Sequence, residues 1–449
     1  MRRLPLVVLA VLFTAGCGGR SAVKLPAAAS VIPAKAPLVL SIDTGASGQL
    51  AAATDLLGRF PETKDAVKVL SYQGLGPELD VVLFDLANDG NDGVGLVRPA
   101  NPAKLEGLLA QSSGQRAHEV VDGWTVYADS RALIEKFKGL RTGASLSTNA
   151  DFREAVASLP AGALARFFVD GPALTASLQR DPSLSGFAPA LGLDTLRWLA
   201  GSLQARHDGI TFQAEAKGVQ AKPSPDYAHL ASRVPADAVV YASFTNLTPL
   251  LERLKALPAV QKQLGGLAGV IAGPILDKAF GLFGKEGALY VEPGKPDPSV
   301  TLVLQESDPV KAFSTVDALA RLGGAESVQI AGRAARKVEV DHQSIYYVTV
   351  SDGLVLSTTA SGIRSALETG GSNLTRDSFF PQAKQEAGMP SQTGGFLYVS
   401  LANGIPALGG LADQFGSNVA SVKPLKALLV YLTGGPRGTL TAKGFLAIK

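Results

Sequence analysis

The chain repeats itself, and this repeat constrains the fold more than any other feature. Residues 32–36, IPAKA, and the apolar run after them align without a gap with residues 234–238, VPADA, and the run that follows. Further segments match in the same order: VRPANPAK with LQESDPVK, DGWTVYADSRALIEKF with DGLVLSTTASGIRSAL, LSTNADFREA with LTRDSFFPQA, LPAGALARFFVD with MPSQTGGFLYVS, and LRWLAGSLQARHDGITF with LKALLVYLTGGPRGTLT. Each match is weak alone, but their shared order predicts an internal duplication.

Strands alternate with helices in each half. Apolar and polar residues alternate in 124–127 and 211–214, which predicts half-buried strands. Short gaps such as 88–93 predict antiparallel hairpins, and Asn101-Pro102 and Asp308-Pro309 predict helix starts. The pattern therefore predicts an α+β fold of two similar lobes, each a largely antiparallel sheet with packed helices. The opening order β-α-β-β-α-β suits a split βαβ unit.

The composition places a linker between the halves. Pro223, Ser224 and Pro225 predict a stiff, extended segment. We expect a first lobe at residues 30–218, a linker at 219–232 and a second lobe at 233–449. Residues 17–29 are small and polar, which predicts a tether, and residues 1–16 read as an export signal.

That signal begins with Arg2 and Arg3 and continues with an apolar run at 6–13. The run is too short to span a bilayer. Residues 14–17, TAGC, resemble the lipobox of bacterial lipoproteins, in which the chain is cut before the cysteine and the thiol carries diacylglycerol. This resemblance implies a palmitate-bearing anchor on Cys17, the only cysteine of the chain. It also implies a location outside the cytoplasm, at a membrane of the cell envelope.

Charge and histidine spacing exclude several function classes. The net charge is +3, and loss of Arg2 and Arg3 leaves 40 basic against 39 acidic residues. This near-neutral balance argues against a nucleic-acid partner. The four histidines, His118, His207, His229 and His342, have no spacing of a metal site or a general base. We therefore expect no metal and no cofactor.

The repeat start and the strand–helix pattern resemble an uncharacterised family of secreted bacterial proteins, filed as domain of unknown function 3352. The motifs that carry this resemblance are the proline, the short gap and the apolar strand of residues 32–42. It covers most of the mature chain. It implies no activity and no site residues.

Residues 38–47, LVLSIDTGAS, resemble the active-site stretch of aspartic peptidases. Those enzymes need two such loops, whose carboxylates share one proton. The repeat partner of Asp43-Thr44-Gly45 is Thr245-Asn246-Leu247, which has no carboxylate, and no second Asp-Thr-Gly occurs. Asp43, Thr245, Asp170 and Ser400 all end strands, so we expect them to cap helix N-termini.

Two further stretches invite a binding interpretation. Residues 88–93, NDGNDG, lack the final glutamate of an EF-hand loop and predict a hairpin turn. Residues 264–276, LGGLAGVIAGPIL, are apolar on every side, which predicts either a buried helix or the lining of an apolar ligand cavity. The lining candidates are Leu264, Leu267, Val270, Ile271 and Ile275. Asp277 ends the stretch too soon for a membrane span.

These observations predict a non-enzymatic, lipid-anchored, two-lobed scaffold outside the cytoplasm. It would contact the membrane through Cys17 and bind an apolar ligand or an envelope protein. Two alternatives stay open: an aspartic-type peptidase that uses Asp43-Thr44-Gly45, and a purely structural envelope protein.

Overall fold

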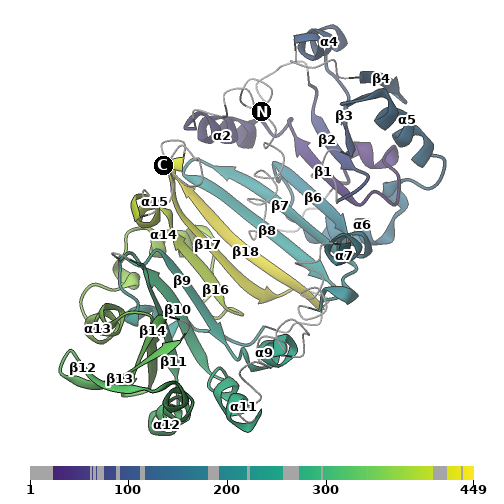
Figure 1. Cartoon of the computed structure of the whole chain (residues 1–449). Helices are drawn as coiled ribbons and strands as arrows, with labels where there is room; N and C mark the ends of the chain where they lie inside the picture. Colours follow the sequence, from purple (N-terminus) through teal and green to yellow (C-terminus); the bar gives the residue numbers. More distant parts are fainter. Residues whose placement is uncertain are drawn as a thin grey trace. The chain divides into compact units, whose positions relative to one another are not determined.

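The computed structural model describes residues 24–60, 63, 67, 75–86, 92–111, 117–180, 192–219, 223–255, 273–294, 297–340, 342–407, 422–435 and 438–449. Helices pack on antiparallel sheet, which confirms the α+β class (Figure 1). The chain divides into two compact units. Unit 1 comprises residues 1–221 and 434–449, and unit 2 comprises residues 222–433.

The described strands of unit 1 form one antiparallel sheet. Their order across the sheet is β4 (Ala117–Val121), β5 (Trp124–Ala128), β3 (Gly93–Val97), β2 (Glu78–Leu83), β1 (Leu38–Asp43), β6 (Ala165–Asp170), β7 (Trp198–Arg206), β8 (Gly209–Lys217) and β18 (Thr439–Ile448). The helices are η1 (Ala27–Ser30), α2 (Ser47–Gly58), α4 (Pro102–Gln111), α5 (Arg131–Leu140), η3 (Leu146–Thr148), α6 (Ala150–Ser158), α7 (Gly171–Arg180) and η4 (Leu193–Thr195).

Unit 2 has a closely related order. Its described strands are arranged as β12 (Glu326–Ile330), β13 (Arg333–Val340), β14 (Gln343–Val350), β15 (Gly353–Ser357), β11 (Ser299–Gln305), β10 (Glu286–Glu292), β9 (Val240–Thr245), β16 (Phe396–Ser400) and β17 (Leu425–Gly434). The helices are η5 (His229–Arg233), α9 (Thr248–Lys255), α11 (Gly273–Gly281), α12 (Pro309–Ala320), η6 (Arg321–Gly323), α13 (Ala360–Glu368), η7 (Leu374–Arg376), α14 (Phe379–Glu386) and α15 (Leu401–Ala407).

The predicted element order is present, but the split βαβ unit is wrong. The chain begins β1, α2, β2, β3, α4, β4, as expected. A split βαβ unit would contain a parallel strand pair. Here β1 pairs antiparallel with both β2 and β6, and β9 does the same with β10 and β16. Each central strand therefore has antiparallel neighbours on both sides.

The helix starts follow the sequence closely. Asn101 Oδ1 accepts a hydrogen bond from Lys104 N at 3.1 Å, and Asp308 Oδ1 accepts one from Lys311 N at 3.0 Å. Both bonds satisfy a backbone donor that the first helical turn leaves free, and the proline that follows each cap has no such donor to satisfy. The predicted Asx-proline starts of α4 and α12 are confirmed.

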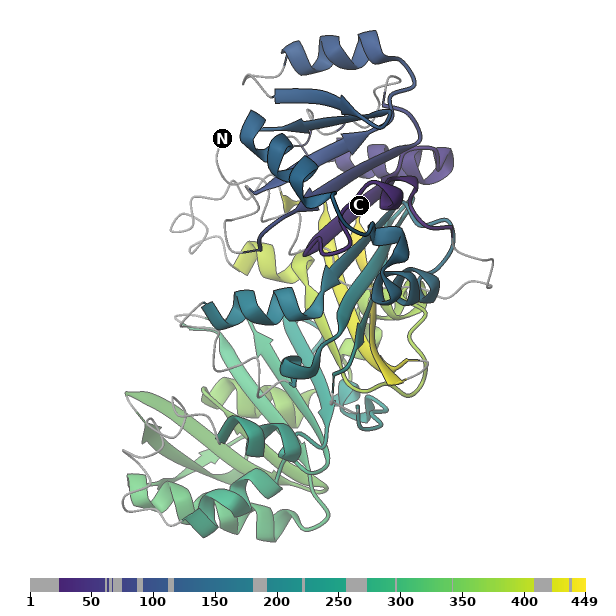
Figure 2. The ribbon, with the colours of Figure 1, turned by 90° about the vertical axis from the view of Figure 1, so that its right-hand side faces the viewer.

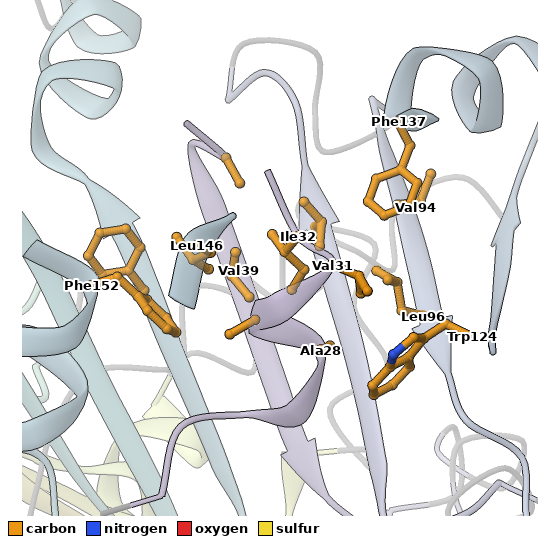
Figure 3. Packing of buried hydrophobic residues seen from close by; sticks show 14 of the residues in the cluster. Ala28, Val31, Ile32, Val39, Val94, Leu96, Trp124, Phe137, Leu146 and Phe152 are labelled. Atoms are coloured by element: carbon orange, nitrogen blue, oxygen red, sulfur yellow. The ribbon is translucent and has the colours of Figure 1, made fainter. Parts of the chain in front are cut away.

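The two faces of the unit 1 sheet carry different side chains. One face, which we call the inner face, holds Val39, Val82 and Phe168, which belong to one core cluster with Phe137 of α5 and Phe152 of α6. Figure 3 shows Val39, Phe137 and Phe152 of this cluster. Burying each of these side chains contributes about 1.5–3 kcal/mol. The opposite, outer face holds residues such as Leu38 and Phe167. In Figure 2, α4 and α5 lie on opposite sides of strands β3, β4 and β5.

The predicted boundary of the second lobe is wrong for its last strand. Residues 233–449 were expected to form one lobe, but β18 pairs antiparallel with β8 of unit 1. Ile448 N donates to Asp208 O at 2.9 Å, and Arg59 Nη1 donates to Ile448 O at 2.7 Å. Without β18, the backbone groups along the edge of β8 would lack these partners.

The predicted tether and linker also extend less far than expected. Ala28 and Ala29 are buried in the core of unit 1, although the tether was predicted to reach residue 29. Asp226, Leu230 and Ala231 are buried within unit 2, although residues 219–232 were predicted to form a free linker. Both segments coil into short 3-10 helices, η1 and η5, whose apolar side chains gain burial.

Candidate functional site

Most of the residues predicted to form a site lie outside the described ranges. This is the case for Cys17 and for the lining candidates Leu264, Leu267, Val270 and Ile271. Ile275 lies in α11. Most of the predicted turn at 88–93 also lies outside the described residues. Among the described helices, none is both long and apolar enough to cross a membrane.

Asp43 does not cap a helix. It ends β1, and its Oδ1 accepts a hydrogen bond from Gly45 N at 3.0 Å, which closes a local turn. The helix that follows, α2, begins after Ala46, whose side chain makes no cap. The cap prediction is therefore wrong for Asp43, because two residues separate it from the N-cap position of α2.

Two of the other strand ends do cap helices. Asp170 Oδ2 accepts a hydrogen bond from Ala173 N at 3.0 Å at the start of α7. Ser400 Oγ accepts one from Asn403 N at 3.4 Å at the start of α15. These residues end β6 and β16, which occupy the same place in the sheets of the two units. The cap prediction is confirmed for this pair of strand ends.

The outer face of unit 2 presents two rows of aliphatic side chains. Both rows run across β11, β10, β9, β16 and β17, which lie side by side in Figure 1. In the first row each residue faces the next across the strands: Leu302, Leu289, Ala242, Leu397 and Val430. The second row is Val300, Val291, Val240, Val399 and Leu428. We call these ten residues the aliphatic face.

None of the ten residues is buried. Leu289 and Leu397 are each 38% exposed, Val300 is 36% exposed, and the others are partly exposed. The alternate residues of the same strands, which point to the inner face, include the buried Tyr241, Tyr290, Tyr398 and Tyr431. The sheet of unit 2 thus buries these four tyrosines and leaves the ten aliphatic side chains of the opposite face in contact with solvent. This reverses the usual preference of a sheet with one solvated face.

The corresponding positions in unit 1 are less exposed. Five of them are buried, Leu38, Gly95, Phe167, Val169 and Gly201, and the other five are partly exposed, Leu40, Val81, Leu83, Gly93 and Leu199. The corresponding rows run across β3, β2, β1, β6 and β7 in the same register. Leu38, Phe167 and Val169 are only 5–8% exposed and form a cluster with Leu174 of α7. In these strands, Gly201 lies opposite Phe167 and leaves room for its ring, because a methyl group at Gly201 would overlap that ring.

Lys426 places a cation on the aliphatic side of the unit 2 sheet, beside the second row. Lys426 precedes Leu428 by two residues on β17, so its side chain leaves the sheet on the same face. Lys426 is partly exposed, and its Nζ donates to Lys423 O at 2.8 Å. The aliphatic face therefore has a positively charged group beside one end of its second row.

Each unit buries one carboxyl group against a serine of its first strand. In unit 1, Ser41 Oγ donates to Asp80, which is fully buried. Burial, together with the nearby Glu78 carboxylate, raises the pKa of Asp80 to about 8. In unit 2, Ser243 Oγ donates to Asp226 Oδ2 at 2.7 Å, and Ala228 N donates to Asp226 Oδ1 at 2.8 Å.

The structure also shows a histidine–carboxylate pair that the sequence did not reveal. His229 Nδ1 lies 2.9 Å from Glu286 Oε2, and the ring of His229 stacks on that of Tyr227 at 5.4 Å. The partners are far apart in sequence, so spacing could not predict the pair. Within the described ranges, no group of three His, Cys, Asp or Glu residues could hold a metal ion.

Comparisons with known proteins agree with one expectation from the sequence. Residues 103–425 match the model of a family described as "Protein of unknown function (DUF3352)". No curated protein matches the chain. Solved structures of TP0453 in crystal forms III, I and IV are similar, at 10%, 12% and 15% identity and TM-scores of 0.27, 0.28 and 0.29. They cover 45%, 45% and 48% of this chain and 83%, 82% and 79% of theirs.

Proposed function

Because the chain belongs to the DUF3352 family of proteins of unknown function, we propose a function from its structure. It is a non-enzymatic, lipid-anchored protein outside the cytoplasm, and its aliphatic face binds the acyl chain of an anionic amphiphile. The observation that carries this proposal is that all ten residues of that face are at least partly exposed, three of them at 36–38%, whereas five of the ten corresponding positions in unit 1 are buried.

The chemistry of the aliphatic face favours an acyl chain. Its ten side chains offer neither charge nor hydrogen-bonding groups, so a polar ligand would lose its hydration there without compensation. The rows cross five strands that are about 4.8 Å apart, which gives a strip roughly 19 Å long that suits an extended chain. Each methylene that leaves water contributes about 0.8 kcal/mol. Lys426 at the edge supplies the charge for a carboxylate or phosphate head group.

We infer that the two units arose by duplication of one ancestral half. Identical local hydrogen bonds support this inference. Leu146 N donates to Ile32 O at 2.8 Å, and Leu374 N donates to Val234 O at the same distance. Two further bonds of unit 1 have counterparts in unit 2. Ala28 N donates to Glu78 Oε1 at 2.9 Å, as Leu230 N does to Glu286 Oε1 at 3.0 Å. Asp170 N donates to Pro37 O at 2.9 Å, as Ser400 N does to Val239 O at 2.8 Å.

The anchor is a separate part of the proposal. The lipobox of residues 14–17 supports lipidation of Cys17 and retention at a membrane. Cys17→Ala should release the protein into the soluble exported fraction or block its processing. If the variant stays membrane-bound and fully processed, the proposed lipid anchor at Cys17 is wrong.

The peptidase alternative has little support. Asp43 makes its hydrogen bond within its own turn, and the corresponding residue in unit 2 is Thr245. Two carboxylates would be needed to activate a water molecule. A purely structural role is the other alternative, and the binding experiment separates it from the proposal.

The binding test uses the Cys17→Ala chain without its signal, stripped of lipid and titrated with a fluorescent fatty acid. Leu289→Asp places a charge in the first row and should weaken binding at least about tenfold, a difference of about 1.4 kcal/mol. Val340→Asp is the matched control, because Val340 is a similarly exposed aliphatic residue on a strand of unit 2 outside the rows. Absence of binding by the parent protein, or equal loss in both variants, contradicts the proposal and favours a structural role.

A further inference from the structure

Unit 2 has a hairpin, β12–β13, that has no counterpart among the described strands of unit 1. Beyond β11 the sheet of unit 2 continues with β15, β14, β13 and β12 (Figure 1). Beyond β3 the described sheet of unit 1 continues with β5 and β4. In the chain, β12 and β13 stand between α12 and β14. Two units of related strand order thus differ by an added hairpin at one edge of the sheet.

This hairpin lines a pocket together with α12. Ser327 lies opposite Arg336 and Gln329 lies opposite Ala334, so these four side chains leave the hairpin on one face. They line, with Phe313 of α12, a hollow of about 360 Å³. Pockets for small molecules have volumes of about 300–1,000 Å³. The hollow is therefore large enough for a small organic ligand.

Two contacts fix the guanidinium group of Arg336 at this pocket. Its Nη1 donates to Ser327 Oγ at 2.6 Å, and its Nε lies 3.3 Å from Asp317 Oδ1. Asp317 is buried and accepts a hydrogen bond from Tyr347 OH at 2.8 Å. Within the described residues, no hydrogen bond or ion pair engages Nη2 of Arg336, and 26% of the side chain is exposed. Nη2 and the second N–H of Nη1 can therefore donate side by side to a carboxylate.

The charges around the pocket favour an anionic ligand. Arg321 Nε lies 2.8 Å from Asp317 Oδ2, so two guanidinium groups share the one carboxylate of Asp317 and leave an excess of positive charge. None of the described residues that line the pocket is acidic. Phe313 is partly exposed and Ala334 is exposed, so both can contact an apolar group. The lining therefore suits an organic anion better than an inorganic one.

The pocket is separate from the aliphatic face. Leu356 of β15 lies opposite Leu302 of the first row, and it packs in a cluster with Tyr347 and with Phe313 of α12. Helix α12 therefore covers the sheet at β14 and β15, between the aliphatic face and the β12–β13 hairpin. A ligand on one surface does not reach the other along the sheet.

We propose that this pocket is a second binding site of unit 2, for a small carboxylate that carries a short aliphatic or aromatic group. The carboxylate accepts hydrogen bonds from Nη1 and Nη2 of Arg336, and the apolar group lies against Phe313 and Ala334. Asp317 and Ser327 position the guanidinium group before the ligand arrives, which lowers the entropic cost of binding.

The test titrates the lipid-free Cys17→Ala chain with phenylacetate and measures binding by saturation-transfer NMR. Arg336→Gln removes the guanidinium group and should weaken binding at least about tenfold. Arg321→Gln is the matched control, because Arg321 pairs with the same carboxylate but does not line the pocket. It should change the affinity less than about twofold. Phenylacetamide, the neutral analogue, should bind the parent protein at least about tenfold more weakly.

Two further variants test the position of the site without removing a charge. Ala334→Trp fills the hollow from an exposed position and should abolish phenylacetate binding, whereas Leu289→Asp on the aliphatic face should leave it unchanged. Circular dichroism confirms that each variant is folded. Any of three results would overturn the proposal: no saturable binding by the parent protein, equal losses in Arg336→Gln and Arg321→Gln, or unchanged affinity in Ala334→Trp.

Discussion

Unit 1 and unit 2 have corresponding outer-face positions across five strands, but unit 1 buries half of them, whereas unit 2 leaves all of them at least partly exposed. In unit 1 the Phe167 ring occupies the space above Gly201, and Leu174 of α7 packs on the same cluster. In unit 2 the corresponding first-row positions hold Leu397 and Val430, a pair of aliphatic side chains without a ring over a glycine. The comparison teaches that two sheets of the same strand order can bury their outer faces to different extents.

The comparison is tested most strongly by truncating the matched residues Phe167 and Leu397. Phe167→Ala removes a buried ring and should lower the free energy of unfolding by about 3–5 kcal/mol. Leu397→Ala removes a side chain that is 38% exposed and should cost about 1 kcal/mol or less. Urea denaturation followed by fluorescence and circular dichroism measures both. Equal losses would show that the two outer faces are equally buried.

The buried carboxyl groups provide a second contrast between the units. The pKa of Asp80 is about 8 in the folded protein, against about 3.9 in an unfolded chain. The folded state therefore binds the proton more tightly, and the stability due to Asp80 is complete below about pH 4 and lost as the pH rises toward 8. Asp80→Asn should flatten this dependence and raise the free energy of unfolding at pH 8 by roughly 3 kcal/mol.

Asp226→Asn in unit 2 is the matched control for that experiment. Asp226 accepts hydrogen bonds from Ser243 and from Ala228 N, and an amide can replace only part of this acceptor capacity. The control should destabilise the protein, opposite in sign to Asp80→Asn. A pH profile that Asp80→Asn leaves unchanged would refute the assignment of the titration to Asp80.

The caps of α7 and α15 give the smallest effect. Asp170 accepts from Ala173 N at 3.0 Å, whereas the bond of Ser400 with Asn403 N is longer, at 3.4 Å. Asp170→Ala should therefore lower the free energy of unfolding by about 1–2 kcal/mol and loosen α7 on the outer face of unit 1, whereas Ser400→Ala should lower it by about 0.5 kcal/mol. Amide hydrogen exchange in α7 and α15 measures how far each helix loosens. A larger loss at Ser400 would contradict this ranking.

The sequence predicts those parts of the structure that depend on local patterns. The α+β class follows from the hydrophobic periodicity and the turn residues, and the helix starts at Asn101 and Asp308 follow from the capping residue and the proline after it. The pairing of β18 with β8 could not be predicted in this way, because it depends on which distant strand edge is free to pair. Asp43 shows the same limit on a smaller scale, since an aspartate can either cap a helix or close a turn, and Asp43 lies three positions before the N-cap of α2.

The candidate binding surface could be predicted only in part. Alternation along β9 and β16 marks two-sided strands, but both faces of these strands carry apolar or aromatic residues. Which face is covered depends on helices elsewhere in the chain. The lining predicted at Leu264 to Ile275 came from a continuous apolar run. The aliphatic face is instead assembled from five strands, each of which contributes one residue to each row. Such a surface has no continuous signature in the sequence.

Photolabelling with a fatty acid that carries a diazirine near its chain end tests the central claim most directly. The lipid-free Cys17→Ala protein is irradiated with the probe, digested, and mapped by mass spectrometry. Labels are expected on peptides that contain Leu289, Leu397 and Val399 of unit 2, and not on those that contain Leu38, Phe167 and Val169 of unit 1. Two outcomes would contradict the account: equal labelling of the unit 1 peptides, or labelling of either set that excess unlabelled fatty acid does not reduce.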